Sequence, residues 1–283
     1  MPKPKTIDRN LIHGKDKEEK YKDATKLDYW WGLKELAADF DVDNYETASG
    51  DKLNDDQQKE VAYIQLLHYT VYVKLSGAFY QMEQMDKVLG PSGPGDRSLD
   101  LMVFEGKEAF DALHTDLYEA FCALVNQLYR LLNRGYYEPI KMDHKKQSPM
   151  TLSDLRYWLR LNKHHDYKVL NSMLHACDRH LDIRHHATHY GAVPVYASMK
   201  SRDLYIQHGF RLGDFLTKYD IVSYMMKGGK MESLLDVSRP RATGLCSDVN
   251  EIYRYIYSRD IFEGYMKDRG LKIKDTYKPY WEK

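Results

Sequence analysis

Seven of the twelve histidines of this chain fall between His164 and His189. The run ends with Arg184 and His189 five positions apart, and His185 follows the arginine directly. A guanidinium is permanently charged and binds phosphate oxygens, whereas an imidazole with a pKa near ~6.5 can take up or release a proton at neutral pH. A fixed cation and a titratable base are the minimum groups for cleaving a phosphodiester without a metal ion. We therefore single out Arg184 and His189 as candidate catalytic residues, with His185 assisting.

The charge around these residues is positive although the chain as a whole is neutral. Lysine plus arginine and aspartate plus glutamate number 42 each, but residues 141–189 contain nine Lys or Arg, five Asp and eight His. A basic segment on a neutral scaffold favours a selective encounter with a polyanion over general coating of DNA. A solvated helix face is the alternative explanation of the same charge.

Two long amphipathic helices are the clearest structural prediction. Apolar residues recur in steps of three and four from Val61 to Met85, with His68 on the same stripe, and again from Phe110 to Leu131. The glycines and prolines of residues 90–95 cannot continue a helix. Two long helices joined by such a loop are expected to lie antiparallel. Because His68 lies on the apolar stripe, we expect it to be a core histidine.

The remaining elements are shorter. Ser153 is expected to be the N-cap of a third helix, and residues 165–189 to form a helix broken near His180. The alternation from Val193 to Ala197 and the apolar run from Leu204 to Ile206 predict a short β-hairpin. Outside these segments we expect helices at 24–40, 215–226 and 247–267, a polar loop at 41–55, and breaks at 228–229 and 238–240.

These elements make up a mainly α fold, an antiparallel helical bundle with a short β-hairpin and additional C-terminal helices. We expect three parts. Residues 1–23 are a flexible charged N-terminal arm, residues 24–191 the helical bundle, and residues 192–283 a C-terminal extension of hairpin and helices packed on the bundle.

The segment from Asp182 to Gly191 reads DIRHHATHYG and resembles the signature of the HEPN superfamily. In that signature an arginine precedes a histidine by a short fixed interval, late in a small helical bundle. Here the pair is Arg184 and His189, and Ile183 supplies an apolar residue just before the arginine. The resemblance covers about residues 55–191. It departs from the pattern at His185, because asparagine often occupies the position after the arginine.

The resemblance implies a metal-independent endoribonuclease that acts as a homodimer, with two motifs meeting at the Arg184/His189 helix. RNA would be the substrate, the 2′-hydroxyl the nucleophile and a 2′,3′-cyclic phosphate the product. Many members serve as toxins or anti-phage effectors, so an inhibitor or regulatory partner is a further expectation. No cofactor is implied.

Three alternatives remain open at the level of the sequence. In the first, Arg184 caps a helix end and His189 is a surface histidine. In the second, the fold is a non-catalytic module for protein–protein assembly, which the balanced charge favours. A third alternative is a histidine-ligated metal protein, because the series His175, His180, His185 and His189 includes a spacing that puts two imidazoles on one helix face; against it, no glutamate occurs from Arg156 to His189.

Composition sets the remaining expectations. The three cysteines (Cys122, Cys177 and Cys246) form neither a disulfide framework nor a zinc pattern, and we expect buried thiols. No apolar run approaches the roughly 20 residues of a membrane span, and residues 1–26 lack the apolar core of a signal peptide. A cytoplasmic protein without membrane partners is the simplest prediction.

Overall fold

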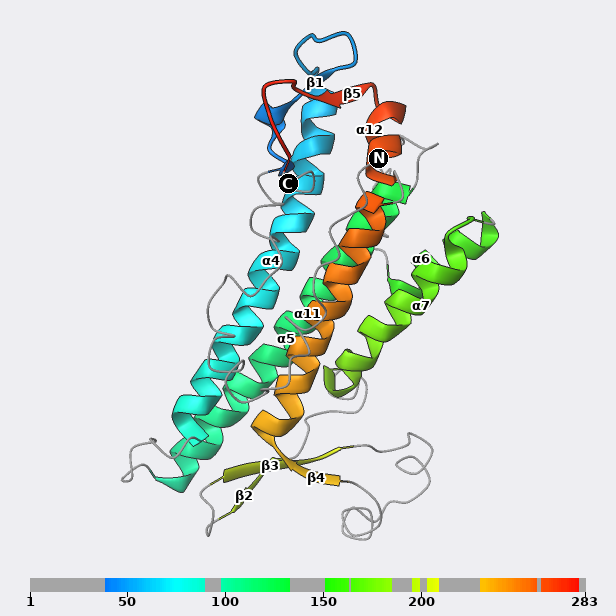
Figure 1. Ribbon diagram of the computed structural model, residues 1–283. Coiled ribbons are helices and arrows are strands. Elements are labelled where there is room, and N and C mark those ends of the chain that lie inside the picture. The colour runs from blue at the N-terminus through cyan, green and yellow to red at the C-terminus, as the bar shows by residue number, and fades with distance from the viewer. Residues whose placement is uncertain are drawn as a thin grey trace, which may run out of the picture. The chain divides into compact units, whose positions relative to one another are not determined.

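The computed structural model describes residues 39–89, 98–132, 151–162, 164–184, 195–198, 203–208, 230–258 and 261–279. These residues are mainly helical, as the sequence predicts, and form a helical bundle with small antiparallel sheets (Figure 1). The α-helices of the described residues are α4 (Asp55–Leu89), α5 (Leu99–Leu132), α6 (Leu152–Leu161), α7 (Tyr167–Asp178), α11 (Leu234–Ser258) and α12 (Ile261–Asp268).

The chain divides into two compact units, and neither is continuous in sequence. The first contains the described residues within 1–76, 119–177 and 245–283, and the second those within 77–118 and 178–244. The helices α4, α5 and α11 therefore each contribute residues to both units. The domain boundary that the sequence predicts after Gly191 lies outside the described residues.

The two long helices predicted from periodicity are α4 and α5, and they run antiparallel. In the second unit, Gly77 on α4 faces Asp116 on α5, and Leu89 at the end of α4 lies beside Gly106 near the start of α5. In the first unit, Lys74 Nζ forms a 2.6 Å ion pair with Glu119. The predicted apolar stripes form the core: the aliphatic and aromatic residues from Val61 to Met85 and from Phe110 to Leu131 on those faces are buried.

His68 is a core histidine, as its place on the apolar stripe of α4 predicts. Its side chain is fully buried, with the Phe40 ring 5.1 Å away and the Tyr253 ring of α11 4.9 Å away, measured between ring centroids. All three residues belong to the first unit.

The predicted break at residues 238–240 is wrong, because Pro240 lies inside α11. A proline supplies no N–H to the helix and crowds the preceding turn, which normally costs several kcal/mol. Two side chains add hydrogen bonds in this turn: Arg241 Nη1 donates to the Val237 carbonyl at 2.8 Å, and Thr243 Oγ1 donates to the Arg239 carbonyl at 2.8 Å. The helix also buries Leu234, Val237, Ala242 and Leu245 around the proline. Packing and these bonds therefore override the local signal.

The helix α6 begins two residues before the position expected from Ser153. Thr151 is the N-cap: its hydroxyl accepts the Asp154 backbone N–H at 3.2 Å, and the Asp154 carboxylate accepts the Thr151 N–H at 3.0 Å. This reciprocal capping box satisfies two backbone donors, whereas Ser153 points out from within the first turn.

The expected helix break near His180 is confirmed. After α7 ends at Asp178, the chain forms a 3-10 turn, η3 (Arg179–Leu181), and residues 182–184 are again helical. The start of α7 at Tyr167 lies two residues later than predicted, because residues 164–166 form a turn.

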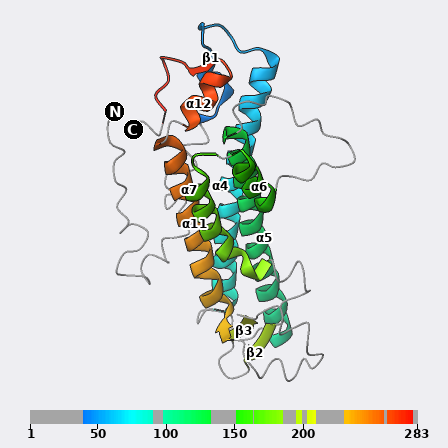
Figure 2. The same ribbon diagram turned by 90° about the vertical axis from the view of Figure 1, so that its right-hand side faces the viewer.

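The predicted hairpin is confirmed and gains a third strand. Strand β2 (Val195–Ser198) pairs antiparallel with β3 (Asp203–His208), and β3 pairs with β4 (Lys230–Ser233), which leads directly into α11. The loop predicted at residues 41–55 instead contains a 3-10 turn, η2 (Val42–Asn44), and β1 (Tyr45–Thr47). Strand β1 pairs antiparallel with β5 (Leu271–Ile273) in a separate two-stranded sheet (Figure 1; Figure 2 shows β1 from another side).

The expected arm at 1–23, the helix at 215–226 and the breaks at 90–95 and 228–229 lie outside the described residues, as does the helix at 24–40 apart from its last two positions. Among the helices that the structure describes, none is both long enough and apolar enough to cross a lipid bilayer.

Candidate functional site

Arg184 lies at the end of the short helical segment that follows η3. Its side chain is half-buried, and its guanidinium carbon is 5.9 Å from the centroid of the Tyr118 ring on α5, within the range of a cation–π contact. Both residues belong to the second unit. His185 and His189 lie outside the described residues, so their part in the site stays a prediction.

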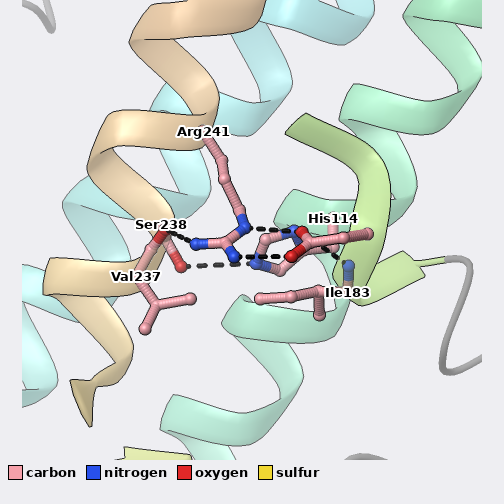
Figure 3. A network of polar contacts seen from close by, with 6 residues as sticks. His114, Ile183, Val237, Ser238 and Arg241 are labelled. Atoms are coloured by element: carbon pink, nitrogen blue, oxygen red, sulfur yellow. Dashed lines mark hydrogen bonds and ion pairs between the residues drawn. The ribbon is translucent and has the colours of Figure 1, made fainter. Parts of the chain in front are cut away.

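A bidentate ion pair holds the segment that leads to Arg184. Arg241 on α11 donates from Nε and Nη2 to the two carboxylate oxygens of Asp182, at 2.7 and 2.8 Å (Figure 3). The Ile183 N–H also donates to Asp182 Oδ1 at 2.9 Å, and the Ile183 side chain is buried. Such a two-point contact fixes orientation as well as distance. The two residues immediately before Arg184 are thereby anchored to α11 and the core.

The same pair fixes the charge of Asp182. Burial by itself raises the pKa of this carboxyl, but the hydrogen bonds and positive charge of Arg241 outweigh it and hold the pKa below its ordinary value. Asp182 is therefore ionised at neutral pH.

Beside this ion pair, His114 on α5 is buried and neutral. Burial, reinforced by the charge of Arg241, lowers the pKa of His114 from 6.5 to about 3. Its Nε2 lies 3.5 Å from Ser238 Oγ on α11, at the long limit of a hydrogen bond (Figure 3). The geometry thus keeps an uncharged imidazole between two helices.

Serine, histidine and aspartate are the residue types of a hydrolase triad, but this group does not form one. Ser238 is fully buried, so no substrate reaches its hydroxyl, and both oxygens of Asp182 accept hydrogen bonds from Arg241. A triad needs an accessible nucleophile and an aspartate that orients the histidine. His114, Ser238, Asp182 and Arg241 therefore form a structural network that anchors the segment before Arg184.

His175 and His180, two histidines of the metal alternative, lie in different environments. His175 is exposed on α7, whereas a Cβ atom at Gly244 of α11 would overlap the imidazole of His180. His180 thus packs directly against the backbone of α11 at a glycine. Neither histidine belongs to a group of three potential metal ligands among the described residues.

Such a group does occur elsewhere, at His164, His165 and Asp166 in the turn before α7. Three consecutive residues match no helical or finger-type ligand spacing, so their spacing in the sequence does not single them out. The structure distinguishes this group because Asp166 is buried and accepts a hydrogen bond from the hydroxyl of Tyr255, a residue of α11. Neither feature can be seen in the sequence.

The cysteines offer no reactive centre in the described residues. None of the three forms a disulfide; Cys177 and Cys246 are buried and Cys122 is partly buried. Burial raises the pKa of the Cys246 thiol far above its ordinary value, so the nucleophilic thiolate does not form at neutral pH.

Comparisons of the chain with profiles of protein families, with curated protein sequences and with solved structures found no match. Of the three candidate catalytic residues, Arg184 is the one that lies within the described residues.

Proposed function

We propose that the chain is a HEPN-like, metal-independent endoribonuclease in which Arg184 and His189 are catalytic and His185 assists. The observation that carries the proposal is the anchoring of Arg184. Asp182 is bound in two-point fashion by Arg241, Ile183 is buried, and the Arg184 guanidinium lies over the Tyr118 ring. A cation whose flanking residues are fixed can act on a developing charge without first being ordered.

The chemistry follows from the two residue types. Neutral His189 removes the proton from a ribose 2′-hydroxyl, and the resulting oxygen attacks the adjacent phosphorus. Arg184 binds the equatorial oxygens of the phosphorane-like transition state. The P–O5′ bond breaks, the 5′-oxygen takes up a proton, and the products are a 2′,3′-cyclic phosphate and a 5′-hydroxyl. Since the nucleophile is the 2′-hydroxyl, DNA is not a substrate.

One motif contains one general base, and the departing 5′-oxygen needs an acid. A homodimer with the Arg184/His189 helix at its two-fold axis supplies a second histidine, and His185 beside the arginine is a further proton donor within the same chain. The dimer, the acid and the bundle type all belong to the proposal.

Cleavage of a mixed RNA pool in the presence of a chelator tests the proposal. Wild type is expected to leave 2′,3′-cyclic phosphate ends, and a single 2′-deoxy substitution at a mapped site is expected to block cleavage there. Arg184→Ala and His189→Ala are each expected to lower the rate by about 10²-fold or more. Matched controls are Arg179→Ala in η3 and His175→Ala on α7, both exposed, which are expected to cleave like wild type. Equal cleavage by all five proteins contradicts the proposal.

A second candidate function, non-catalytic assembly with another copy of this chain, is favoured by one observation on α4. Leu66, Tyr69 and Val73 are 58%, 53% and 40% exposed. Their spacing of three and four residues puts them on one face of the helix. Single exposed apolar residues are ordinary, but a row on one face is typical of an interface.

Sedimentation at a series of concentrations tests assembly through this row. Leu66→Asp is expected to weaken self-association, whereas Leu161→Asp, at an equally exposed leucine of α6, is expected to leave it unchanged. Self-association that depends on Leu66, together with no cleavage of any RNA, would establish assembly in place of catalysis.

A further inference from the structure

Three consecutive side chains in the turn between α6 and α7 bring potential metal ligands together. His164 Nδ1, His165 Nε2 and Asp166 Oδ2 all lie within 4.8 Å of one another. Oδ2 of Asp166 is 3.0 Å from His165 Nε2 and 3.9 Å from His164 Nδ1. Ligands bound tetrahedrally at ~2.0–2.1 Å from one ion stand roughly 3.3 Å apart. The separations of 3.0 and 3.9 Å lie on either side of that value, so small shifts of the His164 and His165 rings let a single ion contact all three ligands.

Asp166 has the environment of a carboxylate prepared for a cation. The residue is only 5% exposed, and the hydroxyl of Tyr255 on α11 donates a hydrogen bond to its Oδ1. Its Oδ2 is buried and accepts no hydrogen bond from the residues that the structure describes. A buried carboxylate oxygen that accepts no hydrogen bond costs free energy, and a cation bound between it and the imidazole nitrogens at 3.0 and 3.9 Å removes that cost. Tyr255 then holds the carboxylate as outer-sphere partners of metal ligands commonly do.

The backbone of the turn fixes the positions of the ligands. The His164 N–H donates to the Leu159 carbonyl at 3.0 Å, and the His164 carbonyl accepts the Tyr167 N–H at 3.0 Å. His164 Nδ1 accepts the Asp166 N–H at 3.3 Å, so this nitrogen carries a lone pair, the form a metal requires. The bond is long, and a metal ion would replace it.

Two neighbouring aromatic rings also position the His164 ring. It lies 6.2 Å from the Trp158 ring on α6 and stacks on the His165 ring at 4.7 Å, measured between ring centroids. Residues of α6, the turn and α11 thus position the group, and all belong to the first unit.

We propose that His164, His165 and Asp166 bind a divalent transition-metal ion, with Zn²⁺ as the best match. Two imidazoles and one carboxylate are ligands that zinc favours, and three protein ligands leave a coordination position open. The His165 side chain is 80% exposed, so solvent reaches the group at this ligand. The inference does not depend on Arg184 or His189, so it stands apart from the proposed RNA cleavage.

Zinc binding to the metal-free full-length chain tests the site by calorimetry. Wild type is expected to bind one ion with a Kd below about 10 μM. His165→Ala is expected to weaken that binding at least about tenfold, and Tyr255→Phe to weaken it by about tenfold through the carboxylate. His175→Ala, which removes another exposed histidine of the first unit, is the matched control and is expected to bind like wild type.

Cobalt gives an independent readout, because Co²⁺ in such a site absorbs in the visible range. The absorption is expected in wild type and in His175→Ala and is expected to be lost in His165→Ala. His165 is exposed, so its replacement leaves the fold intact, which circular dichroism checks. Wild type that binds no zinc below about 10 μM, or His165→Ala that binds like wild type, overturns the proposal. RNA cleavage resistant to chelators leaves the metal site unaffected.

Discussion

The buried, neutral His114 makes the stability of the protein depend on pH. Its pKa falls from 6.5 to about 3 on folding, so the unfolded chain binds a proton in a pH range where the folded chain does not. Protonation of the unfolded state draws the equilibrium toward unfolding. The stability that His114 confers is therefore fully present above its unfolded pKa and is lost progressively as the pH falls from about 6.5 toward 3.

The size of the effect follows from those two pKa values. At about pH 5 the unfolded histidine is almost wholly protonated and the folded one is not, which lowers the free energy of unfolding by about 2 kcal/mol. At about pH 7 the same effect is only about 0.2 kcal/mol. Replacing His114 with glutamine removes the titrating group while keeping a polar side chain beside Ser238.

Urea unfolding at about pH 7 and about pH 5 measures the difference directly. Wild type is expected to lose about 2 kcal/mol more than His114→Gln between the two conditions. His175→Gln, at an exposed position on α7, is the matched control and is expected to keep the wild-type pH dependence. If the variant folds poorly, NMR of the wild-type histidine rings gives the same answer, because the His114 signals should not titrate above about pH 4. Identical pH dependence of wild type and His114→Gln would refute the reasoning.

Three further predictions concern the stability changes caused by substitutions at Gly244, Thr151 and Asp182. Gly244→Ala is expected to stabilise α11 by up to about 1 kcal/mol only when His180 is also alanine, because its Cβ overlaps that ring; additive effects in a double-mutant cycle would contradict this. Thr151→Ala removes the capping box of α6 and is expected to cost about 1 kcal/mol in urea unfolding, so an unchanged midpoint would count against the cap. Asp182→Asn weakens the half-exposed pair with Arg241 and is expected to cost about 1 kcal/mol at low salt and less at high salt; a cost independent of salt would show that the pair contributes no charge attraction.

The elements that the sequence predicts well are those specified by local patterns. The stripes of α4 and α5 each contain many repeats of the helical period, and the hairpin of β2 and β3 needs only neighbouring residues. Strand β1 has no such signal, because three residues are too few for a period and its partner lies at the other end of the described chain. Pro240 gives a wrong prediction for the opposite reason. A proline is a strong local indication of a helix break, but the burial of the apolar face of α11 outweighs it.

The candidate sites show the same difference between local patterns and contacts that are distant in sequence. Arg184 and His189 stand out in the sequence because their types and spacing suffice to suggest chemistry. The anchoring pair of Asp182 and Arg241 joins residues that are 59 positions apart, so no spacing pattern reveals it. The hydrogen bond from Tyr255 to Asp166 spans 89 positions, and it is this distant contact that distinguishes one aspartate from the others nearby.

The pairing of β1 with β5 has a consequence for synthesis on the ribosome. Tyr45, Glu46 and Thr47 find their strand partners only at Ile273, Lys272 and Leu271. Contacts between residues so distant in sequence form slowly, because a long loop must close first. During translation the early strand must therefore wait, with its edge unpaired, until more than two hundred further residues have emerged. A nascent chain of this protein is expected to need protection of that edge for most of its elongation.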